Sequence, residues 1–337
     1  MYAIFWRKPL VYPRLQVTSP AATHWGVWMG LLAAFAGLAT VRLNTGNAIQ
    51  FTLGGMALLV VAMTLHRVQG GRVIGRLILA GVIVAVFFQV GSEGRGRLNL
   101  VTLALVAVVL ACTQMETRRI KVWILAGVAP ALLLMVRLRE RLGVIETGEA
   151  YNGIGSVVNP LGDFGHLVRA HESGVFAFAR SDTLMSTVLF WVPRSVWPEK
   201  PVGFGRELTA ILEPQLLATN QSMATHAYGE WYYSFGWLGV IAMVPVIGLA
   251  LRWLDRLLAR RLEQPVDSRR SLIGLAMVLL LVANIPNLMW AGSFTYVGRT
   301  VQQLAIIALL VLPFAGRVRK PRPRSRVQGY EASSPRH

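Results

Sequence analysis

The chain has 337 residues, of which 54% are hydrophobic and 15% are charged, and its formal net charge is +18 at pH 7. Soluble domains carry about 25% charged residues, so this composition excludes an ordinary soluble protein. A large positive charge also occurs in nucleic-acid-binding proteins. Here, however, the basic residues lie in short segments between long apolar runs, which argues against that class.

The apolar runs predict membrane-spanning helices. A helix needs about 20 mostly apolar residues to cross a bilayer, and continuous apolar runs, unlike alternating ones, favour helices over strands. We therefore expect an all-α polytopic membrane protein with about eight transmembrane helices and one long external loop containing short amphipathic helices. The predicted spans are residues 25–41, 48–65, 73–90, 98–112, 120–136, 235–251, 272–288 and 301–314.

The basic residues predict how these helices are oriented. If the N-terminus is cytoplasmic and eight helices alternate, most of the 34 Lys and Arg residues fall on the cytoplasmic side, in agreement with the positive-inside rule. Both termini are then cytoplasmic. The predicted parts are an N-terminal membrane bundle of about five spans (1–136), an external loop (137–234), a C-terminal bundle of about three spans (235–316) and a disordered basic tail (317–337). We expect the tail to contact lipid headgroups, not nucleic acid.

The external loop is the segment in which polar chemistry is expected. Loops of this length are uncommon without a role, and residues 190–239 combine aromatic, charged and histidine side chains between hydrophobic stretches. Residues 161–170 and 206–218 are predicted to form short amphipathic helices. Residues 184–192 are apolar but too short to cross a bilayer, so they are re-entrant or interfacial.

Cations in this loop suit an anionic ligand. Arg194 lies between Trp191 and Trp197, where a guanidinium fork could clamp phosphate oxygens. The alternative is an arginine that anchors the chain at the membrane interface beside a tryptophan belt. Lys200 and Arg206 flank a glycine-rich turn that could approach a phosphate closely, or that is simply a surface turn leading into a helix.

A second group of polar residues precedes the sixth predicted span. His226 and Glu230 share one face if the helix begins early, and could form a general base with an orienting carboxylate. Tyr228 lies between them. The alternative is a polar cap above an aromatic belt. Further cations stand at predicted outer helix ends, where they line an anionic site or contact lipid headgroups: Arg95, Arg97 and Arg299.

Several motifs are missing. The sequence has no P-loop, no HExxH, no CxxC and no acidic pair of the kind that holds a metal and a nucleotide-sugar. We therefore expect neither a metal site nor a cofactor, and an ATPase, a zinc protease and a nucleotide-sugar transferase lose support.

The order of three segments carries a family resemblance. GSEGRGRLNL precedes a span, PRSVWPEKP lies in the long loop, and HAYGEWYYSFGWLGV enters the next span. This order resembles the Wzy-type O-antigen and capsule polymerases, the oligosaccharide repeat-unit polymerases, which are distant relatives of the O-antigen ligases. The similarity is densest over residues 192–240. The chain departs from the family in size, because members usually have ten or more spans.

The resemblance implies an enzyme of the bacterial cytoplasmic (inner) membrane that joins undecaprenyl-pyrophosphate-type lipid-linked oligosaccharides on the outer face without metal or nucleotide. It implies that Arg194 clamps the pyrophosphate and that His226 or Glu230 assists the acceptor hydroxyl. Membrane lipids, a chain-length regulator and a flippase are the further partners implied. The residues implied in substrate binding are Arg95, Arg97, Lys200, Arg206, Tyr228 and Arg299.

Three alternatives stay open: a non-catalytic transporter (flippase) of lipid-linked glycans, a scaffold subunit of a surface-polymer assembly, and ligase-like glycan transfer. A transporter should carry polar residues at the bilayer midplane. The predicted spans are mostly apolar, with polar residues at their outer ends, and this distribution favours an enzyme at the outer face.

Overall fold

The computed structural model describes residues 15–42, 48–68, 97–112, 155–201, 203–219 and 223–316. In these ranges the fold is all-α, and the β-type pairing is limited to an isolated bridge between Val17 and Val266. The helices are α2 (Pro20–Arg42), α3 (Ala48–Val68), α5 (Arg97–Cys112), α7 (Gly155–Glu172), α8 (Asp182–Val188), α9 (Phe204–Leu212), η2 (Pro214–Thr219), α10 (His226–Glu263), α11 (Arg269–Ala283), α12 (Ile285–Ile306), η3 (Ile307–Val311) and η4 (Leu312–Phe314).

Three of the described helical segments are long and apolar enough to cross a membrane: Pro20–Ala39, His226–Glu263 and Ile285–Phe314. The segments Ile49–Leu65 and Val101–Leu110 are shorter and also apolar. These helices support a membrane protein. The predicted spans at residues 73–90 and 120–136 lie outside the described residues, so the described helices do not establish a count of eight.

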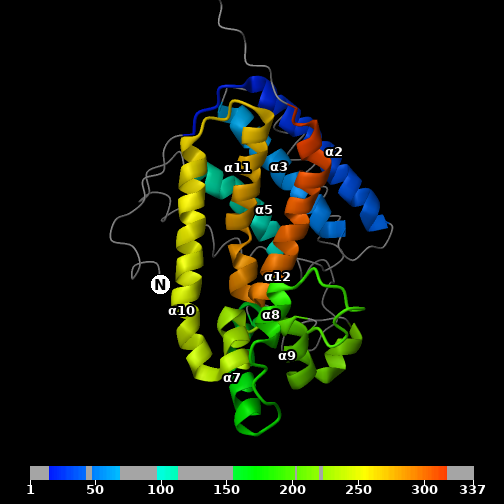
Figure 1. Ribbon diagram of the computed structural model, residues 1–337, viewed down its shortest axis with the longest axis vertical. Helices are drawn as coiled ribbons and strands as arrows, with labels where there is room; N and C mark the ends of the chain where they lie inside the picture. The colour runs from blue at the N-terminus through cyan, green and yellow to red at the C-terminus, as the bar shows by residue number, and fades with distance from the viewer. Residues whose placement is uncertain are drawn as a thin grey trace, which may run out of the picture.

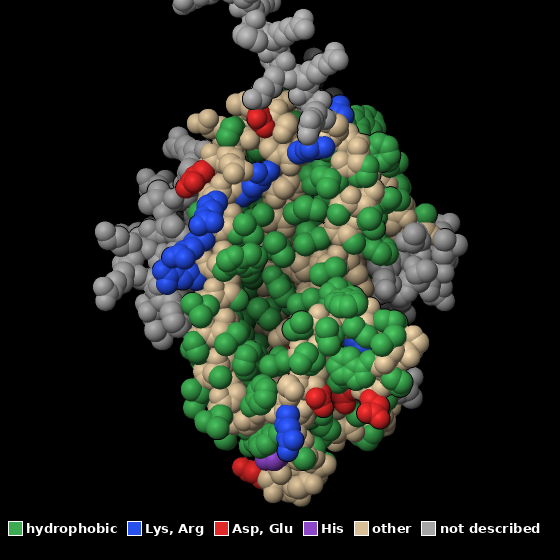
Figure 2. Space-filling model, in the orientation of Figure 1, with side chains coloured by type: hydrophobic (Ala, Val, Ile, Leu, Met, Phe, Trp, Pro, Cys, Tyr) green, Lys and Arg blue, Asp and Glu red, His purple; other side chains and the backbone are tan. Residues whose placement is uncertain are grey.

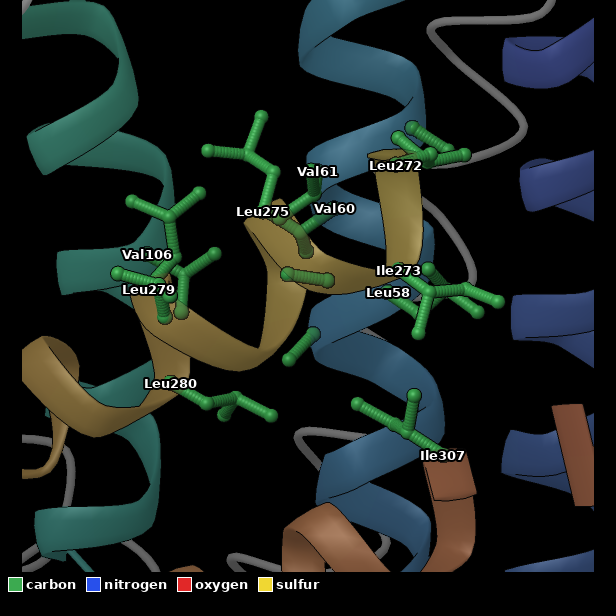
Figure 3. Close-up of a cluster of buried hydrophobic side chains, with 14 of the residues drawn as sticks. Leu58, Val60, Val61, Val106, Leu272, Ile273, Leu275, Leu279, Leu280 and Ile307 are labelled. Atoms are coloured by element: carbon green, nitrogen blue, oxygen red, sulfur yellow. The ribbon is translucent and has the colours of Figure 1, made fainter. Parts of the chain in front are cut away.

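One hydrophobic core joins the two predicted membrane bundles. Buried side chains of α3, α5, α11 and η3 pack together (Figure 3). Leu58, Val106, Leu279 and Ile307, one from each of these helices, are all 0% exposed. Helices from both ends of the sequence therefore fold as a single bundle.

Helices α2 and α3 pack unusually closely because glycines line their contact. A Cβ atom on Gly30 would lie 2.7 Å from the backbone nitrogen of Leu59, and one on Gly37 would lie 2.5 Å from that of Thr52. The pairing of a later α2 residue with an earlier α3 residue shows that the helices run antiparallel. Small residues allow such backbone contact, which drives helix association in lipid, where burial of apolar surface contributes little.

Helix α10 reverses direction at Gly236, whose φ of 65° and ψ of −151° are not helical. Ala227 packs in one cluster with Met243 and Ile247. In a straight helix Ala227 and Met243 would be about 24 Å apart, so the first residues of α10 must fold back along the long part (Figure 1). We call residues 226–235 the re-entrant segment. The sequence analysis placed a span at 235–251 and missed this reversal.

A second reversal lies at Gly292 in α12, with φ 85° and ψ 178°. Asn284 donates a hydrogen bond to Gln303, 19 residues away (2.7 Å), a pair that a straight helix would hold about 28 Å apart. The N-terminal part of α12 therefore continues α11, and the rest returns alongside it. The predicted spans 272–288 and 301–314 have the correct order, but each is too short at the Gly292 end.

The two ends of the bundle differ. Helices α7, α8 and α9 gather at one end, and the connection from α10 to α11 lies at the other (Figure 1). Lys and Arg side chains form a row over the end that carries this connection (Figure 2). Helix α7 contains the predicted amphipathic helix 161–170 and extends beyond both of its ends. The predicted helix 206–218 is divided into α9 and η2.

Candidate functional site

Glu230 lies at the point where the re-entrant segment meets the Gly292 reversal. Its side chain is fully buried, and Oε2 accepts hydrogen bonds from the backbone nitrogen of Ser293 (2.6 Å) and from its hydroxyl (2.8 Å). A Cβ atom on Gly292 would lie 2.8 Å from Oε2. The carboxylate therefore caps the returning half of α12 in the way that an N-cap residue satisfies the free amides of a helix.

The second oxygen of Glu230 has no such partner. The amide of Phe294 faces the carboxylate, but Oε1 has no donor within hydrogen-bonding geometry. A buried acceptor without a partner is unusual and calls for a ligand, an ion or a water molecule. This oxygen is free to accept a hydrogen bond from something that enters the site.

His226 begins the re-entrant segment and is half-buried. Its φ of 58° is rare for a residue other than glycine, and strained residues of this kind cluster at functional sites. The imidazole packs edge-on against Trp290, with ring centres 5.0 Å apart, and lies 5.3 Å from the ring of Tyr228. It also interacts with the backbone of Met289.

The structure brings His226 and Glu230 to the same reversal without joining them. Glu230 bonds Ser293, and His226 contacts Met289 and Trp290. None of the described contacts links the imidazole to the carboxylate. In the described contacts the two side chains therefore meet different residues on the two sides of Gly292: Met289 and Trp290 for His226, and Ser293 for Glu230.

Unpartnered polar atoms concentrate in the re-entrant segment. Among the described residues, the buried side-chain atoms without a hydrogen-bond partner include four between residues 225 and 231, namely Thr225 Oγ1, Tyr228 OH, Glu230 Oε1 and Trp231 Nε1. Buried polar groups in native proteins are nearly always paired. The cluster therefore distinguishes this segment from the rest of the described chain, in which Arg252 Nε and Thr300 Oγ1 are the other such atoms.

Aromatic side chains from the α7 end hold the re-entrant segment in place. Phe164 of α7 makes edge-on contacts with Tyr228 and Tyr232, at centroid distances of 4.8 and 5.5 Å. The reversal leaves the carbonyl of Tyr233 without its helical partner, and it accepts a hydrogen bond from the amide of Ala179 (3.0 Å). The segment is thus fixed by residues that the sequence analysis placed in the external loop.

Arg194 and Lys200 stabilise the loop that carries them. The buried Lys200 ammonium donates to the carbonyls of Phe190 (2.6 Å) and Val192 (2.9 Å). Its pKa is lowered by burial and, secondarily, by the charge of Arg194. Arg194 donates from Nη2 to the carbonyl of Lys200 (2.8 Å), and its side chain is otherwise exposed. Lys200 therefore has a structural role here, while Arg194 keeps most of its guanidinium accessible.

Arg299 lies well inside α12, not at the beginning of a span as the sequence analysis expected. Its Nη1 donates to Asn287 Oδ1 (2.6 Å). Asn287 Nδ2 donates in turn to Asn284 Oδ1 (2.8 Å) and to Thr102 of α5 (3.2 Å). Of the described contacts of Arg299, none is with an acidic side chain.

The chain of hydrogen bonds continues into α3. Asn284 donates to Gln303, and Gln303 Nε2 donates to Gln50 Oε1 (2.7 Å). The network is buried among apolar helices, because four of its side chains are 0% exposed: Thr102, Asn284, Asn287 and Gln303. The sequence analysis missed it. The only signal was the interruption of apolar runs by NIPN and VQQ.

The remaining predicted site residues are dispersed or not described. Arg206 is exposed on α9. Arg97 begins α5, with its side chain outside the described part, and Arg95 lies outside the described residues. No group of metal-binding side chains occurs in the part of the chain that the structure describes. Asp163 of α7 is buried, and desolvation raises its pKa to about 6 against the lowering effect of His166.

No protein-family model, no curated protein and no solved structure matches this chain. Its function must therefore be argued from the site itself.

Proposed function

We propose that this protein is a membrane glycosyltransferase that joins lipid-pyrophosphate-linked oligosaccharide units at the outer face of a bacterial cytoplasmic membrane. The observation that carries the proposal is the cluster of unpartnered polar atoms in the re-entrant segment. Sugars present many hydroxyl groups, which both donate and accept, and the cluster offers hydroxyl, indole and carboxylate groups of both kinds.

The orientation follows from charge. Arginines cluster at the connection from α10 to α11, which the positive-inside rule places in the cytoplasm. The re-entrant segment and helices α7 to α9 then face outward, where lipid-linked glycans are polymerised in the family that the sequence resembles. Eight alternating spans, two of them outside the described residues, would put both termini in the cytoplasm.

The reaction needs a base and a group that stabilises the leaving pyrophosphate. An acceptor hydroxyl attacks the anomeric carbon of the donor sugar, the bond from that carbon to the pyrophosphate oxygen breaks, and the hydroxyl proton passes to His226. The expelled lipid pyrophosphate carries the negative charge. Arg194 is an exposed cation of the described loop, and Arg299 is a half-buried cation without an acidic partner in the described contacts. Stabilisation of the departing charge by such preorganised donors is usually the largest catalytic effect.

Glu230 has a different role from the one first expected. Because Oε2 is held by Ser293, the carboxylate fixes the reversal against which His226 packs. Its free Oε1 can accept a hydrogen bond from a substrate hydroxyl. Tyr228 lies beside His226 and has a buried hydroxyl without a hydrogen-bond partner in the described contacts. A chain-length regulator and a flippase would be its partners in polymer assembly.

The experiment is an assay of the purified protein in lipid nanodiscs with an undecaprenyl-pyrophosphate-linked oligosaccharide. Wild type should convert single units into a ladder of longer products. His226→Ala should lower the rate by about 10²- to 10⁴-fold, the usual contribution of a general base. His24→Ala, at the other end of the bundle, is the control and should leave the rate unchanged. The absence of a ladder with any lipid-linked oligosaccharide would refute the proposal.

The buried network around Arg299 favours a second candidate, a transporter of lipid-linked glycans. Transporters place polar side chains and interrupted helices deep in the membrane, and Asn284, Asn287 and Gln303 lie beside the Gly292 reversal. A transporter would move a fluorescent lipid-linked glycan between leaflets of a vesicle without changing its length. The enzyme would change the length without moving it.

A further inference from the structure

One side of the long part of α10 changes character along its length. Its outward residues are apolar and exposed, with Leu238 at 78% and Leu249 at 56%, and they are followed by Trp253 at 59%. Arg256 and Arg260 come next on the same side and are also exposed. The spacing of about 3.6 residues keeps these side chains in one row. We call this row the α10 stripe.

The arginines of the stripe differ from Arg261 and Arg269, whose side chains contact other helices or loops of the described chain. Arg261 donates to the carbonyl of Ser271 and to Gln264, and Arg269 donates to the carbonyl of Phe314 (3.2 Å) and lies 5.2 Å from the centre of the Trp25 ring. Those arginines fasten helices together. For Arg256 and Arg260, the described residues offer neither a hydrogen bond nor an ion pair.

We propose that the α10 stripe is a binding site for an anionic phospholipid. The phosphate of the headgroup would bind Arg256 and Arg260, which lie one helical turn apart. The glycerol region would contact the Trp253 ring, since tryptophan prefers the interface between hydrocarbon and water. One acyl chain would lie along the apolar residues that precede it.

The apolar part of the stripe is long enough to cross one leaflet of a bilayer. From Leu238 to Trp253 the helix rises about 22 Å, and half of a hydrocarbon core of about 30 Å is about 15 Å. The arginines then lie at headgroup level, where their charges can meet phosphate. Glu263 follows Arg260 by one turn and is exposed, so its negative charge weakens the attraction. The proposal does not depend on the enzymatic activity.

The test measures binding of phosphatidylglycerol and of phosphatidylcholine to the purified full chain in detergent by native mass spectrometry. Wild type should prefer phosphatidylglycerol. The double variant Arg256→Ala/Arg260→Ala should bind it about 30-fold more weakly, with little change for phosphatidylcholine. Each arginine near a lipid surface contributes about 1 kcal/mol, and two such contributions correspond to about that factor. Glu263→Gln should strengthen phosphatidylglycerol binding.

The control Arg169→Ala/Arg270→Ala removes the same charge from exposed positions outside the stripe and should bind phosphatidylglycerol as wild type does. Because all four side chains are exposed, thermal unfolding should stay unchanged and exclude misfolding as a cause. The proposal would be overturned if Arg256→Ala/Arg260→Ala bound phosphatidylglycerol as tightly as wild type does. It would also be overturned if the control variant lost as much phosphatidylglycerol binding as Arg256→Ala/Arg260→Ala. A wild type that binds both lipids equally well would overturn it too.

Discussion

The reversal at Gly292 should depend on the absence of a side chain, and Gly292→Ala tests this. A residue with a Cβ atom in such a conformation is strained by about 1–3 kcal/mol. The new atom would also lie 2.8 Å from Glu230 Oε2 and push the carboxylate away from Ser293. A hydrogen bond to a charged group contributes about 1.5–3 kcal/mol. We therefore expect a loss of at least about 2.5 kcal/mol in the free energy of unfolding.

Thermal unfolding of the detergent-solubilised protein measures this loss. At about 2–4 °C per kcal/mol, Gly292→Ala should lower the midpoint by at least roughly 5–10 °C. The control is Gly298→Ala in the same helix, where an added Cβ meets nothing within 4 Å. Because alanine favours helices more than glycine does, this control should be neutral or slightly stabilising. If the two variants unfold at the same temperature, Gly292 is not the site of the reversal.

Three further predictions concern stability and orientation. Burial raises the pKa of Asp163 to about 6, so the stability that its protonated form provides is present near pH 4 and lost as the pH rises through 6; melts across this range should show the decline in wild type and not in Asp163→Asn. In a Cys112→Ser background, Cys at position 174 should react with an impermeant thiol reagent in cells with a permeabilised outer barrier, and Cys at position 264 should not; the reverse pattern would invert the topology. Gly30→Val should destabilise the protein by about 1–3 kcal/mol through overpacking against α3, and an unchanged melting curve would contradict the close contact of α2 and α3.

The helices whose direction never changes were predictable from the sequence. The predicted helices 48–65 and 98–112 coincide closely with α3 (Ala48–Val68) and α5 (Arg97–Cys112), because an uninterrupted apolar run is enough to indicate an apolar helix. The short helices of the predicted loop were also placed near α7 and α9. In each case the information is local.

The reversals were not predictable, because their causes lie far apart in the sequence. A glycine in an apolar run can serve close packing, as Gly30 does, or a change of direction, as Gly236 and Gly292 do. The choice at Gly292 depends on the hydrogen bond between Glu230 and Ser293, which lie 63 residues apart. The residues at positions 226, 228 and 230 were identified from local polarity. Their partners, and the network around Arg299, required the fold.

The bond between Glu230 and Ser293 also sets an order of events during synthesis. The carboxylate leaves the ribosome 63 residues ahead of the serine that satisfies it. At about 5–20 residues per second, that interval lasts about 3–13 s. During this time Glu230 lacks the serine that donates to it, and the turn against which His226 packs has not been made. The nascent chain can therefore complete this region only after Ser293 has been synthesised, and a ribosome that stalls before Ser293 leaves a product in which α7 to α9 have no finished surface to cover.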